Sequence, residues 1–378
     1  MAKHATPKTR NLIAVDPGLE GVVVGSTRIS DVDGSAGTLS YRGTSVAALA
    51  EQPFAQVASL VALGKPVPAV TDSLNAGIKL SERERALVLA LPRSLLPMQL
   101  LQGVIPLLDK PTDALTLTNA DLDHIAPGET LPTGLAQEAA IALSIAGKLP
   151  EVIATHFKST AVDSNAATYC TRFCDMIGAD SAANQPLVEA FEVMQILQLE
   201  HSFNASTFAA RVIASTLAPI ENALSGAVGT LHGVLHGGAD QAALETADFV
   251  ADPAKAAAFV DQCLADGTKV MGMGHREYKV LDPRARFAKQ LAEQVSAGTE
   301  HERTFAVLAA IEARFSERMQ AQGKSLYANI EFYKGLIFRM LGLPPTYFTA
   351  LFAMARVFGY TAHVLESRIN NRLIRPAA

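Results

Sequence analysis

From Ser45 onward, apolar side chains recur mainly three and four residues apart, in segments rich in Ala, Leu, Glu, Gln and Met. This spacing places them on one face of an α-helix. Residues 134–147 and 186–199 are examples. Another such segment opens at Ser81, with Glu84 three residues later, which is the pattern of a capping box. The sequence therefore predicts a mainly α-helical chain.

Residues 18–43 break this pattern. They are rich in Gly, Ser, Thr and Val and contain the turn pair Asp33-Gly34. This composition favours a short β-hairpin. We therefore expect an all-α fold with a minor β-hairpin near the N-terminus.

The distribution of glycine and histidine indicates how the chain is divided. Both residue types concentrate at 226–238 and 267–275, and a helical stretch of ordinary composition covers roughly 240–322. A length of 378 residues also suggests two domains. We interpret the chain as a large helical domain that is interrupted by a smaller helical one, with the divisions 1–237, 238–336 and 337–378.

Composition excludes some classes of function. Charged residues make up only 18% of the chain, so much of the surface is expected to be hidden by burial or by oligomerisation. A net charge of -5 gives no drive toward nucleic acid or anionic membranes. Three cysteines cannot form a disulfide framework and fit a reducing compartment.

The longest apolar stretch, residues 86–108, contains Arg93 and is interrupted by Pro92, Pro97 and Pro106. A membrane helix needs about 20 mostly apolar residues, so we interpret the stretch as buried helices. The basic N-terminus lacks the apolar core of a signal peptide. A short organellar transit signal is an alternative interpretation of this segment. We expect a cytoplasmic protein without membrane or nucleic-acid partners.

Two histidines lie in the segment LHGVLHGGAD. His232 and His236 are four residues apart, the spacing of a helical metal-binding pair. However, Gly237 and Gly238 disfavour a continuing helix, and no glutamate follows the first histidine. A histidine beside two glycines can face a ligand that approaches the backbone closely. A ligand-facing His236 and a purely structural turn both stay open, and metal binding is disfavoured.

The segment GMGHREYK, followed by DPR, holds His275 within a cluster of cationic residues. It is a poor dinucleotide fingerprint, because Glu277 stands where the third glycine belongs. Phosphate or carboxylate groups would suit the cationic side chains. A solvated charged loop is the alternative. The cationic residues are Arg276, Lys279, Arg284 and Arg286.

Three further residues are candidates for a site. Arg356 is the only formally charged residue between Met340 and Leu365, so it should meet an anion: either Glu366 or another acid, or a bound dicarboxylate. His201 precedes a segment that Asn204 or Ser206 can cap as a helix, where anions are favoured. Glu331 would need burial to act as a general base, and a surface acid is the alternative.

Taken in order, several segments resemble the citrate synthase family. They are HSFNASTFAARVIAST, GVLHGGAD, GMGHREYKVLDPRA, NIEFYKG, FTALFAMARVFGYTAHVLE and NRLIRP, and GLEGVVVGSTRISDVDG resembles the family's N-terminal hairpin. The resemblance covers nearly the whole chain and is weakest at 65–200. The compact length is similar to the short bacterial homodimeric form.

This resemblance implies an all-helical homodimer, or a higher homo-oligomer, whose subunits each close a large and a small domain over the substrates. It implies condensation of acetyl-CoA with oxaloacetate, followed by hydrolysis to citrate and CoA, within the tricarboxylic acid cycle. Acetyl-CoA enters as co-substrate, and neither another cofactor nor a metal is expected.

The resemblance also assigns roles to residues. His236 would donate a hydrogen bond to the enolate oxygen, and His275 would bind and protonate the oxaloacetate carbonyl. Glu331 would remove a proton from the acetyl methyl group. Oxaloacetate would be held by His201, Arg284, Arg356 and, from the other subunit, Arg375. The phosphates of CoA would face Lys279 and Arg276.

The chain departs from the family pattern around the base. Glu331 replaces an aspartate, Asp240 replaces an asparagine, and Ala328 and Lys334 differ from the common P-N-V-D-F-Y-S. Two alternatives therefore stay open. One is a 2-methylcitrate or other alkylcitrate synthase that uses propionyl-CoA or a longer acyl-CoA. The other is a catalytically impaired homologue with a binding or regulatory role.

Overall fold

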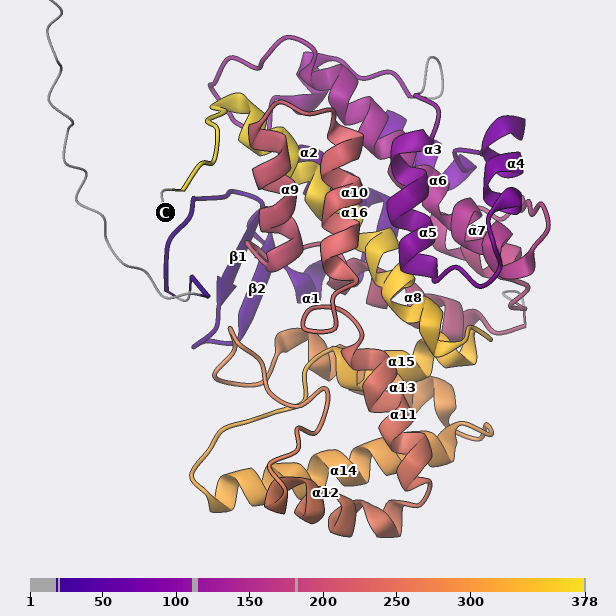
Figure 1. Ribbon diagram of the computed structural model, residues 1–378, viewed down its shortest axis with the longest axis vertical. Coiled ribbons are helices and arrows are strands. Elements are labelled where there is room, and N and C mark those ends of the chain that lie inside the picture. The colour runs from indigo at the N-terminus through magenta and orange to yellow at the C-terminus, as the bar shows by residue number, and fades with distance from the viewer. Residues whose placement is uncertain (1–17, 20, 111–114, 181–182, 377–378) are drawn as a thin grey trace, which may run out of the picture.

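The computed structural model describes residues 18–19, 21–110, 115–180 and 183–376 (Figure 1). In this part of the chain, sixteen α-helices accompany one small sheet, which confirms the all-α class. The helices are α1 (Val46–Leu49), α2 (Phe54–Leu63), α3 (Pro68–Ala76), α4 (Glu82–Ala90), α5 (Pro97–Val104), α6 (Leu135–Lys158), α7 (Tyr169–Ile177), α8 (Gln185–Gln198), α9 (Ala205–Ser215), α10 (Ile220–Leu231), α11 (Ala239–Val250), α12 (Ala256–Ala265), α13 (Pro283–Ser296), α14 (Glu302–Ala321), α15 (Glu331–Met340) and α16 (Phe348–Ile369). Short 3-10 helices are η1 (Ile105–Leu107), η2 (Asn119–Leu122), η3 (Pro253–Lys255) and η4 (Pro345–Tyr347).

The predicted hairpin is present. Strands β1 (Ser30–Asp33) and β2 (Thr38–Tyr41) pair antiparallel, and β3 (Thr44–Ser45) adds a third short antiparallel strand. The hydroxyl of Tyr41 donates to the carbonyl oxygen of Leu197 at 3.1 Å. This buried hydrogen bond attaches the sheet to the end of α8.

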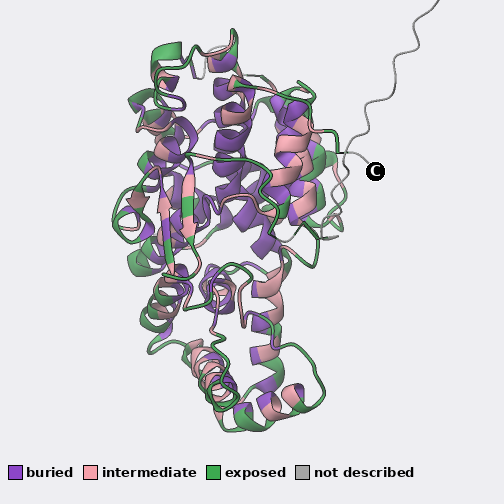
Figure 2. Ribbon diagram, turned by 90° about the vertical axis from the view of Figure 1, so that its left-hand side faces the viewer, coloured by how far each residue is buried: buried purple, intermediate pink, exposed green. Residues whose placement is uncertain are grey.

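Helix α16 forms the centre of the core. It packs against α2, α6, α8, α9 and α10, and nearly all of its residues are buried (Figure 2). By length and composition, Pro345–Ile369 could cross a membrane, yet its most apolar window lies entirely inside the molecule. A central core helix has the same composition, and α16 has that position here.

The apolar stretch 86–108 is divided at its prolines. It covers the end of α4, then α5 and η1; Pro97 is the first residue of α5, and Pro106 lies within η1. Proline is tolerated at the first position of a helix, because that N–H would lack a partner in any case. The interpretation of this stretch as buried helices is confirmed for α5, where Leu100 and Leu101 are fully buried.

Predicted helix starts are also found. The Ser81 side chain accepts a hydrogen bond from Glu84 N–H, and the Glu84 carboxylate accepts one from Ser81 N–H, which completes the capping box of α4. Of the two candidates for capping α9, Asn204 is the cap: its Oδ1 accepts from Thr207 N–H at 3.0 Å.

A proline inside α6 has a specific compensation. Pro150 has no N–H to donate to the carbonyl of Ala146, four residues earlier in the helix. The hydroxyl of Tyr169, in α7, donates to that carbonyl at 3.1 Å. The buried acceptor is therefore satisfied from a neighbouring helix.

Helices α11 to α15 lie together in the lower part of Figure 1. Helix α11 packs against α14 and α15, α12 packs against α14, and α13 packs against α15. Helix α8 reaches this group and contacts α13 and α15. The division of the chain at residues 238 and 336 stays a prediction.

Candidate active site

The loop that carries His275 is fixed to the segment that precedes α15. Gly274 N–H donates to the carbonyl of Tyr327 at 2.7 Å, and Asn329 N–H donates to the carbonyl of Gly272 at 2.9 Å. The side-chain amide of Asn329 donates to the carbonyl of Gly274 at 2.9 Å. Two candidate segments that are distant in the sequence are therefore held side by side.

His275 is fixed in one tautomer by its own loop. Its Nδ1 accepts hydrogen bonds from the backbone N–H groups of Glu277 (3.1 Å) and Tyr278 (3.3 Å). Nδ1 is therefore unprotonated, and the proton of the neutral ring lies on Nε2, 3.4 Å from Nη2 of Arg284. Burial and then the charge of Arg284 lower the pKa of His275 to about 4. The neutral ring thus presents an N–H beside a guanidinium N–H, and an oxygen acceptor would suit both donors.

His201 lies beside this pair. Its ring centre is 5.4 Å from that of His275, and its Nε2 is 3.1 Å from the hydroxyl of Tyr278. Burial and then the charge of Arg284 hold the pKa of His201 well below its usual range. It is therefore a neutral, buried imidazole at physiological pH.

Arg284 is held by the acid that precedes it in the DPR segment. Nε and Nη2 donate to the two carboxylate oxygens of Asp282 at 3.0 and 2.9 Å, and both side chains are nearly fully buried. Burial raises the pKa of Asp282, but the charge of Arg284 and its hydrogen bonds outweigh this and lower it. The fork is thus oriented by Asp282, whose role the sequence analysis did not identify.

Arg356 is buried in α16, only 2% exposed. Its Nε donates to the carbonyl of Gln198 at 2.6 Å, and its guanidinium lies 4.6 Å from the ring centre of Phe352. The predicted alternative of an ion pair with Glu366 is wrong, because Glu366 pairs with Arg211. Among the described residues, no carboxylate forms an ion pair with Arg356, so a bound anion would compensate its buried charge.

A more distant acid does influence Arg356. Burial opposes ionisation of Glu200, but His363 and then Arg356 lower its pKa. Glu200 Oε1 is nevertheless engaged by His363 Nε2 at 2.8 Å and by the hydroxyl of Ser30 at 3.0 Å. Glu200 therefore acts on Arg356 through space and leaves the guanidinium without direct neutralisation.

His236 takes the opposite tautomer to His275. Its Nε2 accepts from Ser206 N–H at 3.3 Å and lies 2.7 Å from Ser206 Oγ, which in turn accepts from the Tyr360 hydroxyl at 2.7 Å. The Ser206 hydroxyl also donates to Asn204 Oδ1 at 2.7 Å. Because the Ser206 N–H can only donate, we assign the proton of the neutral ring to Nδ1. Burial and then Arg356 lower the pKa of His236 to about 4. The ring can donate a hydrogen bond but is not a cation.

The metal-pair interpretation of His232 and His236 has no structural support. Helix α10 ends at Leu231, so the two histidines do not lie one turn apart on a helix. Within the described ranges, no group of three or more His, Cys, Asp or Glu could hold a metal ion.

Glu331 is the first residue of α15, and its side chain is 15% exposed, so it is not a surface acid. Its N–H donates to the side-chain oxygen of Asn329 at 2.9 Å, and its Oε2 lies 2.7 Å from Nζ of Lys334. Burial raises the pKa of Glu331. The charge of Lys334 opposes this rise, and the charge of Asp240 adds to it. The charge of Arg284 also lowers the pKa of this carboxylate. Glu331 therefore lies within electrostatic reach of the histidine and arginine cluster, which consists of His201, His275 and Arg284.

The remaining candidates are less defined. Arg276 and Lys279 are exposed, which leaves them accessible to CoA phosphates, and Lys279 N–H donates to the carbonyl of Gly34 in the hairpin turn. Arg375 is exposed in the segment that follows α16. The roles of all three residues stay predictions.

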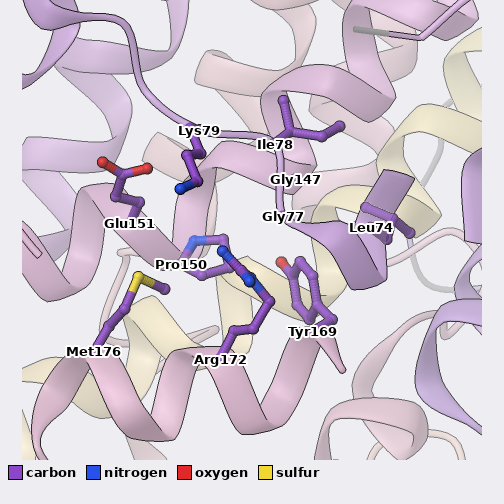
Figure 3. A pocket seen from close by; sticks show the side chains of 10 residues that line it. All are labelled: Leu74, Gly77, Ile78, Lys79, Gly147, Pro150, Glu151, Tyr169, Arg172 and Met176. Atoms are coloured by element: carbon purple, nitrogen blue, oxygen red, sulfur yellow. The ribbon is translucent and has the colours of Figure 1, made fainter. Parts of the chain in front are cut away.

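A separate pocket lies between α3, α6 and α7 (Figure 3). Its charged side chains already have partners: Lys79 pairs with Asp163 at 2.8 Å, and Glu151 pairs with Arg85 at 2.6 Å. It shares no lining residue with the histidine and arginine cluster. Its lining residues are Leu74, Gly77, Ile78, Lys79, Gly147, Pro150, Glu151, Tyr169, Arg172 and Met176.

Comparison with known proteins identifies the family of this chain. The family model described as citrate synthase, C-terminal domain, matches residues 18–377. A citrate synthase from Synechocystis is 34% identical, over 95% of this chain and 89% of that protein. A 2-methylcitrate synthase from Shewanella oneidensis is 32% identical, over 96% of this chain and 93% of that protein.

A solved structure is similar throughout. Citrate synthase from Thermoplasma acidophilum, in a ternary complex with carboxymethyl coenzyme A and oxaloacetate, has a TM-score of 0.81 and 26% identity. The match covers 96% of this chain and 94% of that one. The resemblance first seen in the sequence motifs is confirmed, and the chain belongs to the citrate synthase family.

Proposed function

We propose that this protein condenses acetyl-CoA with oxaloacetate and hydrolyses the resulting citryl-CoA to citrate and CoA. The observation that carries the proposal is the convergence of His275 Nε2 and Arg284 Nη2, 3.4 Å apart, both of them donors. A keto dicarboxylate supplies acceptor oxygens to such a pair. Arg356 and His201 would hold the rest of this dianion, and orientation of this kind contributes several kcal/mol to lowering the barrier.

The reaction follows from the protonation states. In the proposed first step, ionised Glu331 removes a proton from the acetyl methyl group while Nδ1–H of His236 stabilises the enolate oxygen. The methyl carbon then attacks the keto carbon of oxaloacetate. The keto oxygen takes up the proton of His275 Nε2–H as the carbon–carbon bond forms. Nε2 then regains a proton from solvent and Glu331 releases the proton that it took up, so both residues return to their starting states. Water then hydrolyses the thioester and releases CoA as a thiol.

A second candidate, 2-methylcitrate synthesis from propionyl-CoA, uses the same steps. It is favoured by the Shewanella oneidensis relative, which is nearly as similar as the Synechocystis one. A pocket distinguishes one methylene by only about 1–3 kcal/mol, so we expect the protein to accept both acyl groups at different rates.

Assembly and location are part of the proposal. The low charged fraction of 18% supports a homodimer of the short bacterial type, in which Arg375 of one subunit reaches the oxaloacetate of the other. We also propose a cytoplasmic location and a place in the tricarboxylic acid cycle.

The test separates chemistry from binding. We expect Glu331→Gln to lower turnover at least 100-fold, because the amide cannot accept the methyl proton. Oxaloacetate affinity, measured by titration calorimetry, should change less than threefold, because Arg284, Arg356 and His201 are untouched. Turnover that survives the substitution would remove Glu331 as the base. A parallel loss of oxaloacetate binding would show that Glu331 holds the site together rather than acting on acetyl-CoA.

A further inference from the structure

The departures from the family pattern around the base meet in one buried cluster. Lys334 is fully buried, and its Nζ lies 2.7 Å from Glu331 Oε2, 3.1 Å from Asp240 Oδ2 and 2.9 Å from Gln198 Oε1. It also lies 4.5 Å from the ring centre of Phe352. These partners come from α15, α11, α8 and α16.

The buried charge of Lys334 is compensated within the cluster. A buried ammonium without partners would be costly, and here the ammonium of Lys334 pairs with the carboxylates of Glu331 and Asp240. Asp240 is itself 1% exposed, and its Oδ1 accepts from Gln241 N–H at 2.8 Å. Asp240 therefore adds a second negative charge that only Lys334, among the described residues, pairs directly.

Lys334 constrains only one oxygen of Glu331. The two residues lie three positions apart on α15, so the longer side chain of a glutamate can fold back along the helix to reach Nζ. Within the described part of the chain, Glu331 Oε1 has no hydrogen-bond partner, and the side chain keeps 15% exposure. The free oxygen is the one that can accept a proton.

We propose that Lys334 is a positioning residue for Glu331, holding one carboxylate oxygen and leaving the other to act as the base, with Asp240 as the opposing charge. This inference rests on the proposed function, because it assigns a partner to the catalytic base. Gln198 links the cluster to the oxaloacetate site, since its carbonyl accepts from Arg356 while its side-chain oxygen accepts from Lys334.

The charges that face Glu331 predict effects of opposite sign. They are Lys334 on its own helix, Asp240 on α11 and Arg284 on α13. Lys334 favours the ionised carboxylate, so its removal raises the pKa of Glu331. Asp240 disfavours the ionised form, so its removal lowers that pKa. The base works ionised, so activity is lost as pH falls through this pKa.

The experiment is the pH dependence of kcat/KM for the acyl-CoA at saturating oxaloacetate. The acid limb of this profile is the fall in kcat/KM at low pH. We expect Lys334→Met to move the acid limb to higher pH by about one pH unit or more, and Asp240→Asn to move it to lower pH. The double variant should return toward the parent, because one attractive and one repulsive charge are removed together. Lys289→Met, which breaks the partly exposed pair with Glu312, is the matched control and should leave the limb in place.

The outcomes are distinguishable. Active variants whose acid limbs coincide with that of the parent would overturn the positioning role and leave the proposed function standing. If circular dichroism shows that Lys334→Met is unfolded, Asp240→Asn decides alone, because it keeps the contact between Lys334 and Glu331. An unmoved limb in that variant then overturns the inference. A parent protein without turnover would overturn the proposed function and this assignment together.

Discussion

At the scale of single residues, the site depends on two neutral histidines held in opposite tautomers. Backbone N–H groups fix the proton of His275 on Nε2, and Ser206 fixes that of His236 on Nδ1. In the proposed reaction, each ring therefore offers a hydrogen-bond donor to a substrate without carrying a charge. The arginines help to keep the rings neutral. The charge of Arg284 lowers the pKa of His275, and the charge of Arg356 lowers the pKa of His236.

These histidines make stability depend on pH. The folded pKa of His236 and of His275 is about 4, below the ordinary value near 6.5, so the unfolded chain binds protons first. Folding stability is therefore lost as pH falls below about 6.5. Between pH 7 and 5 we expect each histidine to reduce the free energy of unfolding by roughly 2 kcal/mol.

Urea unfolding at the two pH values checks this. Replacing both histidines by asparagine should make the pH dependence less steep. An unaltered slope in the double variant would show that the rings are not held neutral in the folded protein.

Sequence reasoning reached some of these residues and missed others. The isolation of Arg356 in an apolar helix correctly indicated a buried charge, but the nearby Glu366 was a misleading partner, because Arg211 reaches it from α9. Lys334 was noted only as a departure, since spacing along α15 shows that it can meet Glu331 but not that α11 brings Asp240 to the same point. The spacing of residues along one helix does not show which distant segments contact that helix in the folded protein.

At the scale of elements, local signals placed helix ends well. The capping box at Ser81 and the cap at Asn204 are satisfied by residues within four positions, so the sequence contains the whole interaction. Helix α6 runs well beyond the predicted 134–147, to Lys158 and through Pro150. Its continuation depends on Tyr169, a residue of another helix, which no local pattern could supply.

The hydrogen bond from Tyr169 to the Ala146 carbonyl gives a prediction for α6. Tyr169→Phe keeps the ring that stacks on Phe54 but leaves a buried carbonyl unpaired, so we expect a loss of about 1–3 kcal/mol in the free energy of unfolding. In a Pro150→Ala background the restored helical N–H satisfies the same carbonyl, and the loss should be much smaller. Equal losses in both backgrounds, by chemical denaturation, would contradict this account.

At the scale of the whole molecule, the architecture brings residues at the ends of several helices near the same two arginines. Glu331 begins α15, His236 lies between α10 and α11, and His201 precedes α9. Arg284 acts on Glu331 and His201, and Arg356 acts on His236 and His201. The fold class could be predicted from the helical periodicity, and the family from the order of the motifs. Arg375, which is exposed at the end of the chain, depends on a second subunit for its predicted role.

Subunit mixing tests that role. We expect Arg375→Leu to weaken oxaloacetate binding at least tenfold, because one charged contact to the dianion is lost. Co-expression of Arg375→Leu with Glu331→Gln should restore part of the activity, since a hybrid dimer combines Glu331 of one subunit with Arg375 of the other. Unchanged affinity in the single variant, or no recovery in the hybrid, would remove Arg375 from the site.

The most direct test of the central claim is thiol release by the purified protein, with acetyl-CoA and propionyl-CoA in parallel, with and without oxaloacetate. We expect release that strictly requires oxaloacetate, with acetyl-CoA as the faster donor. Faster release with propionyl-CoA would assign the protein to 2-methylcitrate synthesis instead. No release with either donor, in protein that still binds oxaloacetate, would contradict the account and indicate a homologue with a binding role.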